Sequence, residues 1–342
     1  MTDKKSQIAV IGGGPAGVEA ASVLAAHGCN VLLFEAQSDL GHNIANKFKL
    51  FPDFSNATDL IAQLNAKASE QGISLFKSTE IINIEQQQNR WKLTDNADHG
   101  YEADAVLLTT GYEVFDARRK EELGYGIYPG VVTSIDLEHM LKNQKILNII
   151  GDPASRVTFL QCVGSRDEKV GNNYCSKVCC VTAVKQAIET RKVLPDAEIF
   201  LFYMDLRMWG QGFEELYLKA QEEYNVRFVR GRISEAAATF DGRIQIKAED
   251  TLVGQQVRFS TDLLVLMVGM EASCGTKKLS KIFGISNEYG FAQSINQHLG
   301  DNRTTHEGLF LAGACKRPLC ITDSIADARS AAMEILRYLN KQ

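Results

Sequence analysis

The stretch "QIAVIGGGPAGVEAASVLAAHGCNVLLFEA" (residues 7–36) decides the fold class of this chain. It starts with a continuous apolar run, passes through a group of glycines into an alanine-rich segment, and ends in a second apolar run. Such apolar runs are typical of strands buried on both faces of a parallel sheet, and the segment between them is typical of a connecting helix. This strand–helix–strand unit predicts an α/β fold with a parallel sheet.

The glycines between the first strand and the helix follow the G-x-G-x-x-G pattern at Gly12, Gly14 and Gly17. The first glycine permits a tight turn, the second lets a pyrophosphate approach the backbone, and the third lets the helix pack closely on the sheet. The helix N-terminus offers N–H groups and a positive dipole end to phosphates. Glu35 ends the next strand, where a carboxylate can bind ribose hydroxyls. The pattern therefore predicts a dinucleotide site.

Two further stretches complete a three-part pattern with this loop: "LLTTGY" (107–112) and "EGLFLAGACKRP" (307–318). Together they resemble the FAD domain of two-dinucleotide-binding flavoproteins of the thioredoxin-reductase-like group. Ala314 stands where many of those proteins have an acid. The resemblance implies the following FAD contacts: Gly12, Gly14, Pro15, Ala16, Gly17, Glu35, Ala36, Gly41, His42, Asn43, Thr110, Gly111, Gly313, Ala314, Ile321, Asp323 and Ser324.

The remaining periodicity predicts two α/β lobes. Strands are expected at 103–111, 145–151, 158–164, 197–204 and 262–269, and helices at 57–71, 177–194, 213–225 and 323–340. Hairpins are expected before the strands at 103–111 and 262–269. We expect an FAD lobe at 1–115 and 255–342, split by a second lobe at 116–254. No G-x-G-x-x-G follows the strand expected at 145–151, so we do not expect the second lobe to bind a nicotinamide.

Composition excludes several classes of protein. The chain has 342 residues, 45% of them hydrophobic, and a formal net charge of -5. This charge argues against a nucleic-acid partner or an anionic membrane surface. The apolar runs are too short to span a bilayer, and the start has no long apolar segment of a signal peptide. We therefore expect a cytoplasmic protein.

Four of the eight cysteines gather between residues 162 and 180, as Cys162, Cys175, Cys179 and Cys180. The last three are expected at a helix start, where the pKa of a thiol is lowered. If the helix already begins at residue 175, Cys175 and Cys179 share one of its faces. Thiolates of four cysteines commonly hold a 4Fe–4S cluster. Three other interpretations stay open: a structural zinc site, although C-x2-C pairs are missing, a redox disulfide, and buried thiols without chemistry.

Longer stretches resemble the flavin-bearing A subunit of heterodisulfide reductase over nearly the whole chain. They include "LGHNIANKFKLFPDFS", "GYEVFDARRKEELGYGIYP", "QCVGSRD" followed by "YCSKVCC", "FYMDLRMWGQGFEELYLKAQEEYNVRFVRGR" and "LFLAGACKRP". The resemblance implies a thioredoxin-reductase-like fold, FAD and a 4Fe–4S cluster held by Cys162, Cys175, Cys179 and Cys180. It also implies a catalytic lysine beside the flavin, which corresponds to Lys185.

The chain departs from the methanogen pattern at His42, Asn46 and Phe48, and it contains no C-x2-C-x2-C-x3-C run. It therefore resembles the compact form found in the heterodisulfide-reductase-like complex of sulfur oxidisers. That form implies an oxidoreductase subunit that transfers electrons in sulfur metabolism, as a homodimer, with other subunits and electron carriers as partners. The alternative function is a stand-alone FAD-dependent disulfide oxidoreductase, with Cys315 and Cys320 or Cys175 and Cys179 as its exchanging pair.

Overall fold

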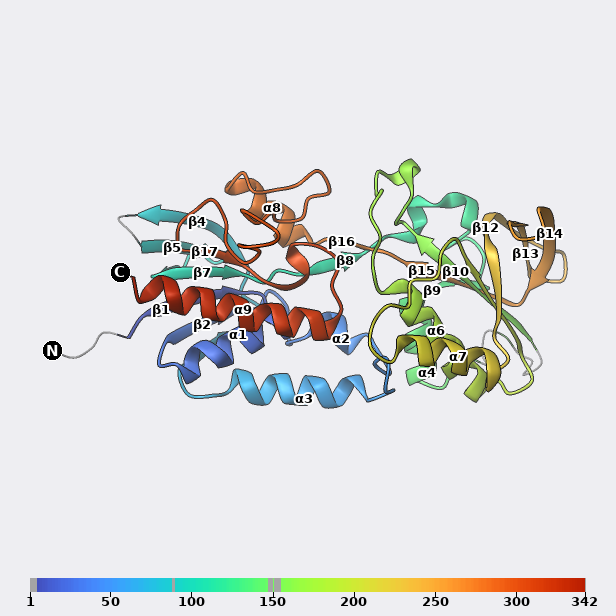
Figure 1. The fold of residues 1–342 in the computed structure, drawn as a ribbon, viewed down its shortest axis with the longest axis horizontal. Helices are drawn as coiled ribbons and strands as arrows, with labels where there is room; N and C mark the ends of the chain where they lie inside the picture. Colours follow the sequence, from blue (N-terminus) through green and yellow to red (C-terminus); the bar gives the residue numbers. More distant parts are fainter. Residues whose placement is uncertain (1–4, 88–89, 147–149, 151–154, 342) are drawn as a thin grey trace. The chain divides into compact units, whose positions relative to one another are not determined.

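The computed structural model describes residues 5–87, 90–146, 150 and 155–341, and the chain forms two compact units (Figure 1). Unit 1 consists of Met1–Ala45, Thr58–Glu113 and Glu271–Gln342; unit 2 consists of Asn46–Ala57 and Val114–Met270. The division differs from the predicted one in two segments expected in the FAD lobe, 46–57 and 255–270, which both belong to unit 2. The second of them contains β14 (Gln255–Thr261) and β15 (Leu263–Val268). Its two strands pair within the sheet of unit 2 instead.

Unit 1 is built on a five-stranded parallel sheet. In spatial order its strands are β17 (Leu309–Leu311), β7 (Ala105–Leu108), β1 (Gln7–Ile11), β2 (Asn30–Phe34) and β3 (Ile73–Phe76). A three-stranded antiparallel sheet accompanies it, with strands β4 (Ile81–Gln87), β5 (Arg90–Asp95) and β6 (Gly100–Ala103). The parallel sheet confirms the predicted α/β class.

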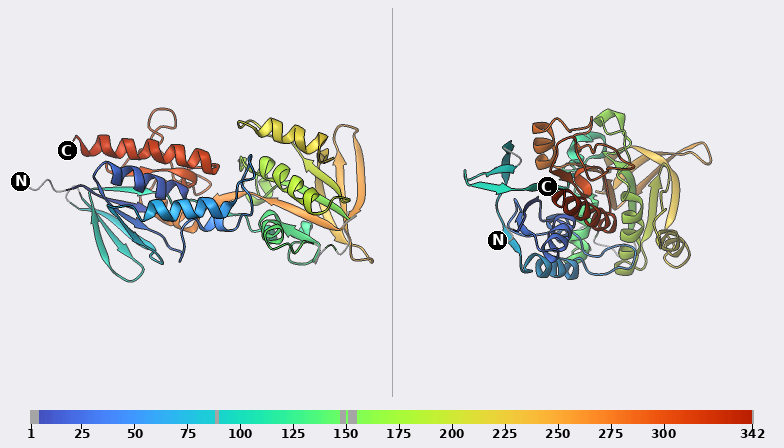
Figure 2. Two further views of the ribbon diagram at one scale, coloured as in Figure 1. Left: turned by 90° about the horizontal axis from the view of Figure 1, so that it is seen from below. Right: turned by 60° about the vertical axis from the view of Figure 1, so that its left-hand side comes forward.

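Alternating side chains of β1 reach the two layers that cover this sheet. Ala9 and Ile11 share a core cluster with Trp91 and Leu93 of β5. The opposite layer consists of helices, of which α9 packs along α1 (Figures 1 and 2). The helices of unit 1 are α1 (Pro15–Ala26), α2 (His42–Ala45), α3 (Ala57–Ala68), α8 (Cys274–Ile282), the short turn η4 (Gly313–Cys315) and α9 (Ile321–Leu339).

Unit 2 is built on a seven-stranded sheet whose order is β14-β13-β12-β11-β10-β15-β9. Its strands are β9 (Val131–Thr133), β10 (Arg156–Val163), β11 (Glu198–Tyr203), β12 (Arg227–Ala238), β13 (Ile244–Asp250), β14 (Gln255–Thr261) and β15 (Leu263–Val268). Strands β12, β11, β10, β15 and β9 are parallel to one another. Strand β13 pairs antiparallel with both β12 and β14. The predicted hairpin before residues 262–269 is therefore present.

The helices of unit 2 are α4 (Ser134–Lys142), α6 (Cys179–Val193) and α7 (Phe213–Glu222), with the short turns η1 (Ala117–Arg119), η2 (Glu121–Leu123) and η3 (Glu168–Val170). Among the described residues of unit 2, the α-helices share one core cluster with the sheet, and the turns η1 and η2 belong to the cluster on its other face. A capping box starts α4: the Thr133 hydroxyl accepts from the Asp136 N–H, and the Asp136 carboxylate accepts from the Thr133 N–H. Two short strands, β8 (Tyr112–Val114) and β16 (Met270–Ala272), pair separately.

One predicted strand of unit 2 cannot be compared with the structure over most of its length. The strand expected at 145–151 falls largely on residues 147–149 and 151, which lie outside the described residues. In unit 2, β10 is the strand that leads to helix α6 (Cys179–Val193). The loop between them carries no G-x-G-x-x-G pattern. In the part of the chain that the structure describes, none of the helices has the length and apolar character needed to cross a membrane.

Candidate functional site

The residues predicted to contact FAD converge at one edge of the parallel sheet of unit 1. The glycine loop follows β1, Glu35 follows β2, Thr110 follows β7 and Gly313 follows β17. These four strands lie side by side in the order β17, β7, β1, β2, and each pair of neighbours is parallel. Their carboxyl ends therefore meet at the same edge of the sheet. In open α/β sheets this edge is where ligands bind.

The glycine loop has the shape that a pyrophosphate needs. Gly12 has φ +116°, and a Cβ there would lie 2.4 Å from the carbonyl oxygen of Thr109. A Cβ on Gly14 would have no atom within 4 Å, which leaves its outer side open to a ligand. Gly14 caps α1 without a side-chain hydrogen bond, and the first turn of α1 has no acidic residue. The backbone N–H groups of that turn can therefore donate to phosphate oxygens.

Glu35 supports the loop as well as facing the expected ribose position. Its carboxylate accepts hydrogen bonds from the backbone N–H of Gly13 and of Gln37, each at 2.8 Å. A carboxylate can accept about four hydrogen bonds, so capacity for ribose hydroxyls remains. The neighbouring loop is joined to this one, because the Gly41 N–H donates to the Gly13 carbonyl at 3.0 Å.

The remaining predicted contacts are held by bonds within unit 1. The Asn43 amide donates to the Tyr112 carbonyl at 2.9 Å, and the Thr110 hydroxyl lies 2.6 Å from that of Thr276. Helix α9 begins at Ile321 with Cys320 as its N-cap, and Cys320 Sγ accepts from the Asp323 N–H at 3.4 Å. Pro15, Ala16 and Gly17 open α1; Ala36 and His42 are exposed; Ser324 is buried in the first turn of α9.

An ion network that the sequence analysis missed holds the Gly313 turn. The Gly313 N–H donates to Asp327 Oδ2 at 2.7 Å. Lys316 is buried and its ammonium lies 2.7 Å from Asp327 Oδ1 and 2.8 Å from Asp301 Oδ2. Arg317 pairs with Asp301 as well, and together these cations hold the pKa of Asp301 well below its ordinary value against the effect of burial. Asp327 thus places a carboxylate at the turn where Ala314 lacks one.

The four predicted cluster ligands lie along the crossover from β10 to α6 in unit 2. Cys162 is near the end of β10, Cys179 and Cys180 are the first residues of α6, and all three are buried. Cys179 hydrogen-bonds both Cys162 and Cys180. Cys175 lies in the loop before α6 and is partly exposed. The helix begins only at Cys179, and Lys177 has φ +64°, which no α-helix contains, so the condition for Cys175 and Cys179 to share a helix face is not met.

The backbone around Cys162 is irregular in a way that aims its side chain. The register between β10 and β15 shifts between Leu160 and Val163, and Cys162 has φ +61°. Because of this bulge, Leu160 and Val163 face one core cluster while Cys162 faces the other, with Cys179 and Cys180. Bulges and left-handed non-glycine residues are often found at functional sites.

Several buried polar atoms on residues that flank Cys162 in the chain have no hydrogen-bond partner among the described residues. They are both amide atoms of Gln161, the Ser165 hydroxyl and Arg166 Nη1. Buried polar atoms are nearly always paired in native proteins, with protein, water or a bound group. N–H and O–H donors on residues this close in the chain to Cys162 are of the kind that can donate to anionic sulfur.

Nearby cations and thiol contacts shift the pKa values of these cysteines. The hydrogen bond between Cys180 and Cys179 lowers the pKa of Cys180 to about 7 despite its burial. The charges of Arg207 and Arg166 lower this pKa further. The pKa of Cys162 is lowered by the same neighbour, Cys179, and by Arg166. The pKa of Cys179 is raised well above its ordinary value because it donates to Cys162 and Cys180 and is buried. Thiolates, which bind metal, are favoured at two of the three positions.

Within the described ranges, no group of three or more His, Cys, Asp and Glu side chains is arranged to hold a single metal ion. A cluster of several irons binds one thiolate at each corner, so its ligands do not have to converge on one point. All eight cysteines are free thiols, and none is joined in a disulfide. Four thiols are the usual ligand complement of a 4Fe–4S cluster, so the donor chemistry of this site is compatible with one.

Lys185, predicted as a catalytic residue, lies fully buried on α6. Its ammonium donates to the Lys49 carbonyl at 2.8 Å and to Glu138 Oε1 at 2.6 Å, and it lies 3.1 Å from Glu189 Oε2. Gln186 also donates to Glu138 Oε1, at 2.7 Å. An ammonium has three donors, so these acceptors can use all of them. The network stabilises unit 2, and a place for Lys185 beside a flavin stays a prediction.

Glu189 makes the stability of unit 2 dependent on pH. Burial raises its pKa from 4.5 to about 7, although Lys185 acts in the opposite direction. An acid with a raised pKa binds its proton more tightly in the folded state, so its stabilising effect is complete below 4.5 and is lost as pH rises through 7. From the two pKa values, the loss in unfolding free energy is roughly 3 kcal/mol.

We expect Glu189→Gln, which resembles the protonated acid, to remove most of this decline. Unfolding by urea at a series of pH values across the interval from 4.5 to 7 and beyond measures it. Glu223→Gln changes the same charge at an exposed site on the C-terminal end of α7 and is the control. Parallel pH profiles for wild type and Glu189→Gln would contradict the assignment.

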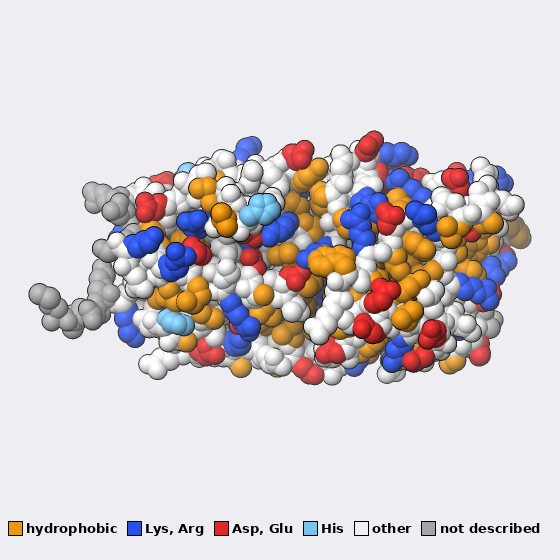
Figure 3. Space-filling model, viewed as in Figure 1, with side chains coloured by type: hydrophobic (Ala, Val, Ile, Leu, Met, Phe, Trp, Pro, Cys, Tyr) orange, Lys and Arg blue, Asp and Glu red, His pale blue; other side chains and the backbone are white. Residues whose placement is uncertain are grey.

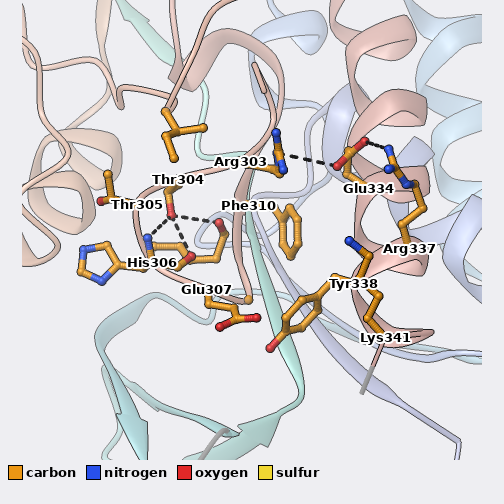
Figure 4. A pocket seen from close by; sticks show the side chains of 13 residues that line it. Arg303, Thr304, Thr305, His306, Glu307, Phe310, Glu334, Arg337, Tyr338 and Lys341 are labelled. Carbon is orange, nitrogen blue, oxygen red and sulfur yellow. Dashed lines mark hydrogen bonds and ion pairs between the residues drawn. The ribbon is translucent and has the colours of Figure 1, made fainter. Parts of the chain in front are cut away.

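A pocket of about 320 Å³ lies elsewhere in unit 1, at the start of β17 and the end of α9 (Figure 4). Polar groups in its wall are already paired: Thr304 donates to the Leu309 carbonyl at 3.0 Å, and His306 Nε2 lies 2.8 Å from the Phe283 carbonyl. Glu334 pairs with Arg303 and Arg337. The pocket adjoins the amino end of β17, whereas the predicted FAD residues adjoin its carboxyl end, so we assign it no role.

Relatives of this chain are found among the heterodisulfide reductases of methanogens. The A subunit of the H2/formate:CoB-CoM heterodisulfide,ferredoxin reductase of Methanococcus maripaludis is 39% identical over 240 residues, which cover 67% of this chain and 36% of the relative. The iron-sulfur A subunit of the CoB–CoM heterodisulfide reductase of Methanocaldococcus jannaschii is 38% identical over 240 residues, with the same coverage. The chain thus spans about a third of the length of these curated relatives.

Solved structures agree in fold. Thioredoxin reductases of Lactococcus lactis and T. acidophilum each superpose with a TM-score of 0.68, at 18% and 17% identity, over 99% of this chain and nearly all of theirs. This confirms the predicted thioredoxin-reductase-like fold. A family model described as pyridine nucleotide-disulphide oxidoreductase matches residues 6–334, and membership supports FAD as a cofactor. The chain is therefore an oxidoreductase of the pyridine nucleotide-disulphide oxidoreductase family, related to the A subunits of heterodisulfide reductases.

Proposed function

We propose that this chain is the electron-transfer subunit of a heterodisulfide-reductase-like complex, with FAD in unit 1 and a 4Fe–4S cluster in unit 2. The observation that carries the proposal is the grouping of Cys162, Cys179 and Cys180 at the β10–α6 crossover, beside orphaned polar donors. In a dinucleotide-binding lobe that crossover normally carries the phosphate loop. Here thiols stand in its place.

The chain's own residues would bind and shield the two groups. The Gly12–Gly17 turn would hold the pyrophosphate, Glu35 the ribose, and the Gly313 turn the remainder of FAD. Cys162, Cys175, Cys179 and Cys180 would hold the cluster, with Gln161, Ser165 and Arg166 as donors to its sulfur atoms. When bound, FAD would exchange electrons in pairs or singly and the cluster would pass them singly. Burial of three of the thiols would exclude water from most of the cluster.

The finer parts of the proposal concern its biological setting. We propose that the chain acts in disulfide or persulfide redox metabolism, as in the compact complexes of sulfur oxidisers, in the cytoplasm and as a homodimer. Partner subunits and electron carriers would supply the sulfur chemistry. The relatives' printed names, which connect their A subunits with heterodisulfide and ferredoxin, support this setting.

The alternative is a stand-alone disulfide oxidoreductase that uses Cys315 and Cys320. Burial raises the pKa of Cys315 to about 12, and its thiol donates to the carbonyls of Leu108 and Ala312. Cys320 caps α9. A thiol that stays protonated is a poor nucleophile, so these contacts disfavour Cys315 as a partner in exchange.

Iron and acid-labile sulfide per flavin, measured on anaerobically purified protein, test the proposal. About four of each per FAD are expected, the content of one 4Fe–4S cluster. Cys179→Ser should lose nearly all iron and sulfide and keep its flavin. Cys274→Ser, at an exposed cysteine of unit 1, is the matched control and should keep both. Wild-type protein with flavin but without iron and sulfide, despite supplied iron, would favour the alternative.

A further inference from the structure

Arg166 lies in the loop after β10, shortly beyond Cys162 in the chain. Its backbone has φ +52°, a left-handed conformation that is uncommon for residues other than glycine and that clusters at functional sites. Its N–H donates to the Tyr174 carbonyl at 2.9 Å. Tyr174 immediately precedes Cys175, so this bond ties the backbone of Arg166 to the segment that carries a second predicted cluster ligand.

The guanidinium of Arg166 is held at one end only. Its Nη2 donates to Asp205 Oδ2 at 2.6 Å, whereas its Nη1 is buried and has no hydrogen-bond partner among the described residues. A guanidinium has five donors and stays charged in proteins, and a buried polar atom without a partner is rare. One end of a permanent cation is therefore available to a bound group.

The charge of Arg166 acts on three of the four predicted ligands. Arg166 lowers the pKa of Cys162 and of Cys180, in addition to the larger effect of their hydrogen bonds with Cys179. Burial lowers the pKa of the guanidinium, yet the paired carboxylate, Cys162 and Cys175 raise it overall. A cluster held by these cysteines would therefore lie within the field of this cation.

Asp205 places an opposing charge at the same site. It lies in the loop after β11, and its backbone carbonyl oxygen is 3.8 Å from the Cys180 sulfur. Its carboxylate pairs with Arg230 at 3.8 Å as well as with Arg166. The hydrogen bond with Arg166 holds the pKa of Asp205 below its ordinary value, so the carboxylate is ionised. The site thus combines a mostly buried cation with a half-exposed anion.

Many other charges of unit 2 lie at its surface. On the face shown in Figure 3, basic and acidic side chains lie beside one another over this unit, and water and salt screen such charges. Of the other cations near the cysteines, Arg207 is exposed and Lys177 directs its ammonium to the Trp209 ring, 4.5 Å from its centre. Arg166 differs because only 23% of its side chain is exposed, and a charge in the protein interior acts more strongly on its neighbours.

We propose that the Arg166–Asp205 pair sets the reduction potential of the cluster in unit 2, with Arg166 raising the potential and Asp205 lowering it. The inference rests on the proposed function, because it needs a cluster at the four cysteines. Reduction adds one electron to the cluster, and no covalent bond forms or breaks. A nearby cation that donates to sulfur favours the reduced form, which carries the additional negative charge. A nearby carboxylate has the opposite effect.

An anaerobic redox titration of the full chain with dithionite, followed by the low-temperature EPR signal of the reduced cluster, measures this potential. We expect Arg166→Gln to shift the equilibrium at least about tenfold toward the oxidised cluster, which lowers the potential of a one-electron couple by about 59 mV. Arg166→Lys keeps the charge and should recover most of the shift. Asp205→Asn should shift the equilibrium at least about threefold toward the reduced cluster, because it removes the opposing charge.

Two variants remove the same charges elsewhere in unit 2 and are the controls. Arg258→Gln changes an exposed residue of β14, four strands from β10 in the sheet, and Asp241→Asn changes an exposed residue in the turn between β12 and β13. Both should leave the potential unchanged, because exposed charges at a distance are screened.

Each preparation is first analysed for iron, sulfide and flavin. An unchanged potential in Arg166→Gln with its cluster intact would overturn the inference and leave the proposed function standing. Shifts of the same sign in Arg166→Gln and Asp205→Asn would also overturn it, since a loosened site would change both variants alike. If Arg166→Gln lost its cluster, a higher potential in Asp205→Asn would support the inference, and an unchanged or lower one would overturn it. Wild-type protein without iron and sulfide would overturn both proposals.

Discussion

Gly17→Ala is expected to be purified without flavin. A Cβ at this position would lie 1.8 Å from the Gly12 carbonyl oxygen and 2.7 Å from the Thr109 hydroxyl. Neither neighbour can yield easily, because Gly12 lies in the strained turn at φ +116° and the Thr109 hydroxyl donates to the Ile11 and Gly12 carbonyls. Helix α1 would have to move away from β1, and its first-turn N–H groups would move away from the pyrophosphate.

The flavin-to-protein ratio and the affinity for added FAD measure this effect. We expect affinity to fall by at least about tenfold, or 1.4 kcal/mol, because the overpacked turn adds its own cost of about 1–3 kcal/mol. Gly100→Ala is the control, since a Cβ at that position of β6 meets no atom within 4 Å. Full flavin content in Gly17→Ala would show that the turn does not hold the pyrophosphate.

Lys185→Met is expected to cost unit 2 about 3–5 kcal/mol of unfolding free energy, the usual effect of removing one partner from a buried ion pair. Lys185 and Glu138 are both almost fully buried, with their charged atoms 2.6 Å apart. Methionine keeps most of the volume of the lysine stem and removes its charge. Glu138 and Glu189 would then be left without their cation in a region that excludes water.

Urea unfolding at fixed cofactor content measures the loss. Lys219→Met is the matched control: its ion pair with Glu223 on α7 is exposed and 3.7 Å long, so we expect a change of at most about 0.5 kcal/mol. Adding Glu138→Gln and Glu189→Gln to Lys185→Met should restore part of the stability, because the buried charges are then removed together. Equal losses in Lys185→Met and Lys219→Met would show that the buried network contributes little.

Much of the fold, including the glycine turn where we expect FAD to bind, could be predicted because it depends on residues close together in the chain. The strand, glycine turn and helix at 7–36 are local, and the apolar run of β1 indicates burial on both faces without knowledge of its neighbours. The phosphate loop needs only glycines at fixed spacing between a strand and a helix. The predicted hairpin ahead of residues 262–269 was likewise visible from alternation and turn residues.

Features that depend on distant residues could not be predicted in this way. The carboxylate of Asp327 reaches the Gly313 turn across a helix start, and its partner Lys316 is tied to Asp301 of another loop. No pattern in the chain marks Glu138 as the neighbour of Lys185, since 47 residues separate them. The segment 255–270 was assigned to the wrong lobe because β15 is as apolar as a strand of the first sheet, and only pairing with β10 and β9 places it.

The sequence by itself determined the α/β class and the glycine turn between β1 and α1, because periodicity and spacing follow from local backbone geometry. The role of the four cysteines as cluster ligands stays a prediction. Only the tertiary structure decided that Cys162 turns through a bulge toward Cys179, that Cys175 stands outside the helix, and that Lys185 is enclosed by carboxylates. These outcomes depend on which strands pair and on which side chains the resulting core encloses. Burial and long-range contact decide them, and neither is encoded in any short stretch of the chain.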